Sequence, residues 1–271
     1  MSVASFIMKK ISRLVVKHSH NDYNRLFTWY FNLRYLPWHQ AKCLPIVFYG
    51  HPRIVAQERT KIEIQAAEIT HGMIQINKTN ESPCNSGCDI ELVLKGKSIT
   101  FRGGATIGSG GKWVFYGDSE VVFGANILIN NGVMIGSCAS IKIGDNVVIA
   151  HQCQIFDTDF HFVYNVNSKV VKNQCSPIVI GKNVWLGNRV SICKGAYLPD
   201  YSIVAANSMV NKDFLHCPTA TFFAGIPAIP TKKRGTLIRR NDNMLWHYFV
   251  EHNCAEYEVQ NAYEQFGIDL E

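Results

Sequence analysis

Aliphatic residues recur every six positions through the middle of this 271-residue chain. A period of six matches neither an α-helix nor the simple alternation of a strand. It predicts short extended segments joined by tight corners, with an aliphatic side chain turned inward each time. Three such segments make a coil of about 18 residues, and stacked coils share one core. The longest run contains Ile180, Leu186, Ile192, Leu198, Val204 and Val210.

Compact residues follow most members of this run, where a bulky side chain at a corner would clash. They are Gly181, Gly187, Cys193, Pro199 and Ala205. Two earlier runs have the same spacing and overlap out of phase by two residues at SIKIGDN. They contain Phe123, Ile129, Ile135 and Ile141, and then Ile143, Ile149 and Ile155. We therefore expect an all-β solenoid domain over residues 61–212.

The two flanking regions do not follow this repeat. Residues 1–60 are predicted to be helical and rich in aromatic residues, and residues 213–271 to form an extended segment and then a helix. The first 18 residues combine apolar positions at helical spacing with interrupting lysines and arginines. This pattern excludes a secretory signal and a membrane span. The segment either rests on a membrane surface or covers one end of the main domain.

Charge and cysteine content narrow the classes of partner. Hydrophobic residues make up 47% of the chain, which supplies a packed core. The net charge of +6 falls short of a dedicated nucleic-acid binder, so no nucleic-acid partner is expected. Nine cysteines, an odd number, favour reduced thiols and a cytoplasmic location. Cys84 and Cys88 have the spacing of half a metal site, but no second pair follows, so no metal is predicted.

The regular spacing stops after Ile155, and His161 stands at the next position in the count. Regular repeats resume only at Ile178, so a loop over 157–177 leaves the coil. A long loop that interrupts a rigid scaffold is usually functional. Histidine is the side chain suited to act as a base near neutral pH, which makes His161 the candidate catalytic residue. His151 is the rival candidate for the base. The remaining alternative is that His161 has a structural role and takes no part in a reaction.

Three stretches within about residues 120–232 resemble the hexapeptide-repeat acyltransferases, nearest to the maltose, galactoside and polysaccharide O-acetyltransferase branch. They are IGDNVVIAHQCQI, IVIGKNVWLGNRVSICKGAYLPDYSIVAANSMVNKDF and FFAGIPA. The resemblance implies a left-handed parallel β-helix, with an N-terminal helical region and a C-terminal helix attached here. It also implies a homotrimer with active sites between neighbouring β-helices.

The implied reaction is acetyl transfer from acetyl-CoA to a saccharide hydroxyl, in the biosynthesis of a bacterial surface polysaccharide or glycan. His161 would take the proton from the acceptor hydroxyl and return it to the leaving thiolate. Asp159, or else Asp157, would orient the imidazole ring. Asn130, with Asn131 beside it, would hold the acceptor or the tetrahedral oxyanion.

The resemblance also implies a site for acetyl-CoA along the β-helix. Backbone groups of Asn188 and Ala206 would contact the pantetheine arm. Lys212 and Lys232 would contact the nucleotide phosphates. Some relatives have a basic residue where Ile229 stands here. Trp185 matches an aromatic residue common in the family, with packing as the open alternative. The implied cofactor-binding residues are Asn188, Ala206, Lys212, Lys232 and Trp185.

Several alternatives stay open at this level. N-acetylation of an amino sugar would use the same scaffold and base, and a non-catalytic β-helix binding scaffold would keep the fold without the catalytic base. A metal-dependent hydratase needs three histidines, whereas the only HxxxxH pattern, His247 and His252, lies in the C-terminal region. The sequence does not identify the sugar or the acyl-chain preference. Peripheral contact between the N-terminal region and the inner membrane is also left open.

Overall fold

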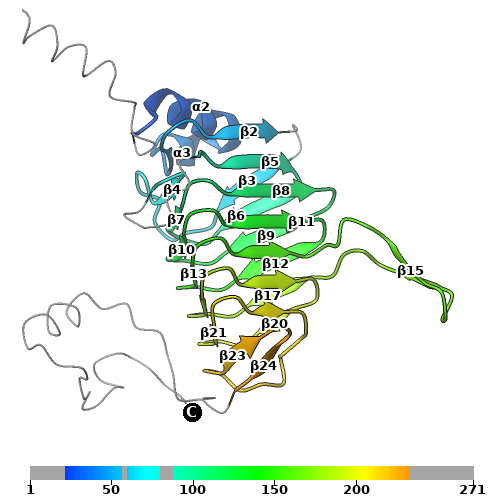
Figure 1. Ribbon diagram of the computed structural model, residues 1–271. Helices are drawn as coiled ribbons and strands as arrows, with labels where there is room; N and C mark the ends of the chain where they lie inside the picture. The colour runs from blue at the N-terminus through cyan, green and yellow to red at the C-terminus, as the bar shows by residue number, and fades with distance from the viewer. Residues whose placement is uncertain (1–21, 57–59, 80–87, 232–271) are drawn as a thin grey trace, which may run out of the picture.

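The computed structural model describes residues 22–56, 60–79 and 88–231. In this part, the chain winds into a parallel β-helix whose sides are three long sheets (Figure 1). Successive strands pass from one sheet to the next, and each strand pairs with the strand one coil away. Helices α2 and α3 lie at the N-terminal end of the described chain, and a hairpin arm projects from the side (Figure 1).

The three sheets are named here in the order in which the chain enters them, and their strands pair in parallel except for the antiparallel pair β23 and β24. The first sheet contains β1 (Ile46–Phe48), β4 (Ile74–Ile76), β7 (Ala105–Ile107), β10 (Ile127–Ile129), β13 (Val148–Ile149), β18 (Trp185–Leu186), β21 (Ile203–Val204), β23 (Phe222–Gly225) and β24 (Ala228–Pro230). The second sheet contains β2 (Arg53–Ala56), β5 (Glu91–Lys95), β8 (Lys112–Tyr116), β11 (Met134–Ser137), β14 (Gln154–Phe156), β19 (Ser191–Cys193) and β22 (Met209–Val210). The third sheet contains β3 (Lys61–Ile64), β6 (Ser98–Phe101), β9 (Glu120–Phe123), β12 (Ser140–Ile143), β17 (Ile178–Ile180) and β20 (Tyr197–Leu198).

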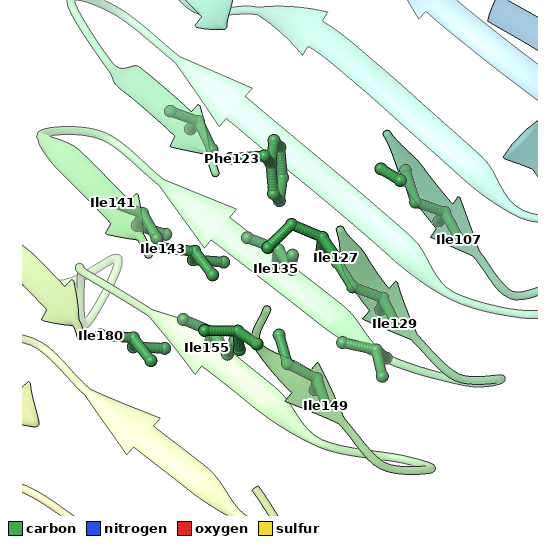
Figure 2. Packing of buried hydrophobic residues seen from close by; sticks show 14 of the residues in the cluster. Ile107, Phe123, Ile127, Ile129, Ile135, Ile141, Ile143, Ile149, Ile155 and Ile180 are labelled. Carbon is green, nitrogen blue, oxygen red and sulfur yellow. The ribbon is translucent and has the colours of Figure 1, made fainter. Parts of the chain in front are cut away.

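The predicted period of six is confirmed as a set of inward aliphatic columns. Every member of the run from Ile180 to Val210 is at most 2% exposed. Along one side of the coil, Ile129 lies beside Ile149, and both point into the interior (Figure 2). Burying a side chain of this kind contributes roughly 1.5–3 kcal/mol, so the columns are the main source of stability.

The phase change at SIKIGDN has a structural cause. Strand β12 turns both Ile141 and Ile143 inward and Lys142 outward, because successive side chains of a strand alternate. The earlier run ends on the first inward residue of this strand, and the later run starts on the second. Leu128 lies beside Val148, 20 residues on, so this coil has two more residues than a regular coil of 18.

The compact residues after the inward positions are required by the stacking of coils. A Cβ atom on Gly181 would lie 2.4 Å from Oδ1 of Asp200, and one on Gly187 would lie 2.7 Å from the backbone nitrogen of Ala206. Neither glycine has a positive φ, so close approach of the next coil, and not backbone conformation, excludes larger residues here.

Helices α2 (Arg25–Tyr35) and α3 (Trp38–Ala41) cover the N-terminal end of the β-helix (Figure 1). The Phe31 ring packs against Phe48 of β1, with ring centroids 4.8 Å apart. The helical, aromatic character predicted for this region is thus present, and the stretch packs on the protein. Strands β1 and β2 already pair within the sheets upstream of the expected start at residue 61.

Parts of the prediction fall on segments that the structure does not describe. Four predicted features lie outside the described residues: the amphipathic segment before residue 22, the predicted C-terminal helix with His247 and His252, Lys232 and Cys84. Within the described ranges, no helix is long and apolar enough to cross a membrane.

Replacing a central inward residue should destabilise the fold strongly. We expect Ile149→Ala to lower the free energy of unfolding by about 2–5 kcal/mol, because the side chain is 0% exposed and the rigid coils above and below leave a cavity. The matched control is Ile229→Ala, at a position that is 60% exposed and should change little. Urea denaturation followed by fluorescence measures both, and equal midpoints for the two variants would contradict the columnar core.

Candidate active site

Residues 157–177 leave the coil between β14 and β17 and form a long arm (Figure 1). In the arm, β15 (Val163–Asn165) pairs antiparallel with β16 (Val170–Lys172). Oδ1 of Asn165 accepts hydrogen bonds from the backbone N–H groups of Asn167 and Ser168, which closes the turn. The predicted loop is therefore a β-hairpin whose residues 159–173 are all exposed.

A buried carboxylate anchors the base of the arm. Asp157 is 0% exposed, and its Oδ2 accepts from the Ser137 hydroxyl at 2.6 Å and from the backbone N–H of Ala139 at 3.0 Å. Its Oδ1 accepts from the backbone N–H of Cys138 at 2.8 Å. These donors belong to the corner of the preceding coil, where the two extra residues lie. Asp157 thus ties the start of the arm to that corner, and its carboxylate is fully engaged there.

A lysine from the next coil holds both strands of the arm together. Nζ of Lys194 lies 2.5 Å from Oδ2 of Asp159 and donates to the backbone carbonyl of Asn173 at 3.0 Å. Asp159 stands on the outgoing strand and Asn173 on the returning strand, and the backbone N–H of Asp159 also donates to Gln174. We call Lys194 with these partners the arm clamp. The role of Asp159 in orienting the histidine stays a prediction.

His161 follows the clamp at the root of the hairpin and is exposed. The count of six marks position 161 as inward, but the chain has already left the coil after Asp157. Phe160, in a left-handed conformation with φ 59°, packs edge to face on Phe156 with ring centroids 5.9 Å apart. Its N–H donates to the Thr158 hydroxyl at 2.9 Å. The residue before His161 is therefore held on the scaffold.

A second group of predicted residues stacks along the corner between the first and second sheets. Because Ile149, Leu186 and Val204 lie side by side, the residues two positions further on also stack: His151, Asn188 and Ala206. Oδ1 of Asn188 accepts from the backbone N–H of His151 at 3.2 Å, and the Asn188 carbonyl accepts from Asn207 at 2.9 Å. We call this corner the asparagine corner. The side chains of Asn188 and Ala206 are exposed.

The two asparagines one coil earlier differ in their surroundings. Asn131 is 0% exposed, and its Oδ1 accepts from the backbone N–H of Ser109 at 3.1 Å, so it serves the coil corner. Asn130 is half-buried and donates from Nδ2 to the Ile149 carbonyl at 3.2 Å. Of the pair, Asn130 is the one whose side chain reaches the surface.

Three titratable groups near the arm and the asparagine corner favour their neutral forms. Burial lowers the pKa of His151, so this ring holds a proton less readily than a free histidine. Burial raises the pKa of the Cys193 thiol, and the Asp159 charge adds to the rise. Burial also raises the pKa of Cys153 to about 11, and its thiol donates to the Gly187 carbonyl. These thiols stay protonated near pH 7, which makes them poor nucleophiles. Within the described ranges, no group of three or more His, Cys, Asp or Glu side chains could hold a metal ion.

The remaining predicted residues occupy separate surfaces. Trp185, on the outer face of β18, is 37% exposed and belongs to the first sheet. Lys212 is exposed just after β22, at the corner between the second and third sheets. Register places it one coil below Lys194, since Ile192 lies beside Val210.

One chain does not bring the two groups together. His161, Asp159 and Lys212 lie at the corner between the second and third sheets, whereas Asn130, Asn188 and Ala206 lie at or beside the asparagine corner. The whole second sheet separates the groups. Sequence reasoning missed Lys194 and the structural role of Asp157. Both occupy the second position after an inward isoleucine, Ile192 and Ile155, and a coil-by-coil alignment would have paired them.

Comparison with individual known proteins identifies the family, although no family model matches the chain. The galactoside O-acetyltransferase of Escherichia coli (strain K12) is 30% identical over 175 residues, which cover 63% of this chain and 78% of that protein. The polysialic acid O-acetyltransferase of Neisseria meningitidis is 28% identical over 141 residues, covering 49% and 66% of the two chains.

Among solved structures, the polySia specific acetyltransferase NeuO is similar with a TM-score of 0.51 and 21% identity. The match covers 80% of this chain and 91% of that chain. The expected fold class, a left-handed parallel β-helix, is therefore confirmed. Since the similarity to the galactoside O-acetyltransferase extends over more than three quarters of that enzyme, this chain belongs to the hexapeptide-repeat acyltransferases and is an acyltransferase.

Proposed function

We propose that the protein transfers an acetyl group from acetyl-CoA to a hydroxyl of a saccharide, with His161 as the general base. The observation that carries this proposal is the anchored arm. An exposed histidine stands at the root of a hairpin that Asp157 and Lys194 tie to the rigid coils. A general base must be held at a fixed place, and this arrangement supplies one on an otherwise regular surface.

In the proposed mechanism, the neutral imidazole of His161 takes the proton of the acceptor hydroxyl as its oxygen attacks the thioester carbonyl. The tetrahedral intermediate collapses, the carbon–sulfur bond breaks, and the imidazolium gives its proton to the leaving thiolate. An amide N–H from Asn130 would stabilise the oxyanion of the intermediate. Asp159 would stabilise the imidazolium through its negative charge while it keeps its ion pair with Lys194.

The proposed assembly is a homotrimer in which each site forms between two chains. His161 and Lys212 come from one chain, and Asn130, Asn188 and Ala206 come from its neighbour. The separation of these groups across the second sheet supports this arrangement, because only a second copy can join them. The small Ala206 leaves room for the pantetheine arm, and Lys212, with Lys232, would meet the phosphates of acetyl-CoA.

The acceptor and location follow from chemistry that the relatives share. We propose a saccharide acceptor of a bacterial surface glycan, since the relatives' names carry galactosides and polysialic acid. We propose the cytoplasm as the location. Cys43, Cys138, Cys153, Cys175 and Cys193 are free thiols, which suits a reducing compartment.

Removing the base should abolish transfer and spare binding. We expect His161→Ala to lower kcat by about 10²–10⁴-fold, the usual contribution of a general base. Calorimetric titration of acetyl-CoA should still give about one site per chain, because the ring is not required for binding. The assay follows thiol release with a galactoside, an oligosialic acid and an amino sugar as acceptors.

The rival histidine provides the matched control. His151→Gln should leave kcat nearly unchanged, since its ring is half-buried in the asparagine corner. A His161→Ala enzyme with full kcat would refute the mechanism, and an acetylated amine as the sole product would replace the hydroxyl acceptor. If neither acetyl-CoA nor free CoA binds, acetyl-CoA is not the donor and the proposed reaction is wrong.

The arm clamp should act through position. We expect Lys194→Met to lower kcat by about 10–100-fold with a smaller change in KM, because a small displacement of a base has an effect of that size. Lys194→Arg should restore most of the activity, since a guanidinium can contact both Asp159 and the Asn173 carbonyl.

The control for the clamp is Lys97→Met, which breaks an ion pair of the same length, 2.5 Å to Glu120, on the third sheet. Exposed pairs of this kind contribute little to stability, so this variant should keep both kcat and Tm. Equal kcat values for Lys194→Met and Lys97→Met would remove the clamp from the mechanism.

A further inference from the structure

The net charge of the chain is concentrated at its N-terminal end. The first 45 residues carry seven Lys or Arg and a single acidic residue, Asp22. The whole chain carries 27 Lys or Arg and 21 Asp or Glu, so the +6 net charge comes entirely from this segment. Residues 46–271 together carry 20 Lys or Arg and 20 Asp or Glu, so as a sequence they add no net charge. Such an asymmetry indicates a surface that meets an anionic partner.

Helix α2 lies in this segment, and three of its large apolar side chains face outward although Phe31 is buried. Leu26 is 84% exposed, Trp29 60% and Tyr30 56%, and the spacing of these residues places them on one face of the helix. Trp38 of α3, at the same end of the molecule, is 72% exposed. We call these four residues the cap patch. Large aromatic and aliphatic side chains gathered on a surface mark an interaction site.

The opposite face of α2 combines the buried Phe31 ring with two buried polar side chains. The Thr28 hydroxyl accepts from the backbone N–H of Phe48 at 3.0 Å. The Asn32 side chain donates to the Ile46 carbonyl at 2.6 Å and accepts from the Ile46 N–H at 3.2 Å. Polar contacts and the packing of Phe31 on Phe48 thus hold the helix on β1, while Trp29 and Leu26 face outward. The fold does not require these apolar residues, so their exposure needs another explanation.

Cations surround the cap patch. Arg25 lies one helical turn before Trp29, Arg34 lies one turn after Tyr30, and Lys42 follows α3; all three are exposed. Tryptophan and tyrosine partition into the interfacial region of a bilayer, and arginine and lysine contact anionic headgroups beside them.

We propose that the cap patch docks the protein on an anionic membrane surface. Leu26, Trp29, Tyr30 and Trp38 enter the interfacial region, and the surrounding cations bind phosphate-bearing headgroups. Charge complementarity favours this occupant over a second copy of the chain, whose own cap patch would bring like charges together. The inference does not rest on acetyl transfer.

The position of the patch suits a flat surface. The cap lies at one end of the β-helix, and the arm projects from its side (Figure 1). Docking through the cap therefore leaves the arm and the asparagine corner uncovered. In a homotrimer about an axis parallel to the β-helix, three cap patches would face the same way. Weak single contacts would then add up through avidity.

The test is flotation of the full-length protein with vesicles. One set consists of phosphatidylcholine alone, and the other contains about one third phosphatidylglycerol, at low and at high salt. The double variant Leu26→Ser/Trp29→Ser removes apolar contacts, and Arg25→Gln/Arg34→Gln removes charge. The matched control is Leu215→Ser/Ile229→Ser, at positions that are 63% and 60% exposed near the other end of the described chain.

We expect wild-type protein and the control to float with anionic vesicles at low salt. Each cap variant should show an affinity for these vesicles that is lower by about tenfold or more. Tm and transfer to a soluble acceptor should be unchanged in the cap variants. No flotation of wild type, equal binding to neutral vesicles, or full binding by both cap variants would overturn the proposal.

Sedimentation without vesicles distinguishes membrane docking from self-association of the chain through the cap patch. If the cap variants differ from wild type only in self-association, the patch joins two copies of the chain and the membrane proposal is wrong. Loss of acetyl transfer by His161→Ala has no bearing on flotation. Failure of the proposed reaction and failure of membrane docking are therefore distinguishable in the same preparations.

Discussion

The structure depends on the stacking of parallel coils around shared columns of aliphatic side chains. Each inward residue packs on the equivalent residue one coil away, as Ile129 does on Ile149 and Ile149 on Leu186. Backbone hydrogen bonds between the same strands satisfy the polar groups that the core would otherwise leave unpaired. Corner residues must be small where the next coil approaches, as at Gly187. The six-residue period of the sequence results from this geometry.

The same geometry explains how the scaffold tolerates an inserted arm. Only the inward residues and the strand pairing must keep register, so a coil can lengthen at a corner. Trp185 lies beside Ile203, 18 residues on, whereas Val148 lies beside Trp185, 37 residues on. Closing a longer loop costs little extra entropy. Binding the insertion in place needs specific groups. Asp157 of the arm binds the corner of the preceding coil, and Lys194 of the following coil binds both strands of the arm.

The molecule separates its surfaces by chemistry. The sides of the β-helix carry the histidine arm and the asparagine corner. The N-terminal end carries exposed aromatic residues beside Arg25, Arg34 and Lys42, on helices α2 and α3. Helix α2 is held on β1 by the Phe31 ring and by polar contacts of Thr28 and Asn32. A repeat architecture permits this separation, because each coil contacts only its neighbours and the ends can differ freely from the middle.

The sequence by itself determined the solenoid, the inward residues and the place of the interruption, because these follow from a local period that any coil must obey. It also located His161 at the interruption. Only the tertiary structure decided what the flanking aspartates contact. Asp157 and Asp159 are two residues apart in one loop, yet one is buried against the corner at Cys138 and the other pairs with Lys194. Those partners lie 19 residues before Asp157 and 35 residues after Asp159, and coil stacking alone brings them into contact. The distance between His161 and the asparagine corner was likewise hidden, because a six-residue count gives depth in the coil without saying which corners share a site.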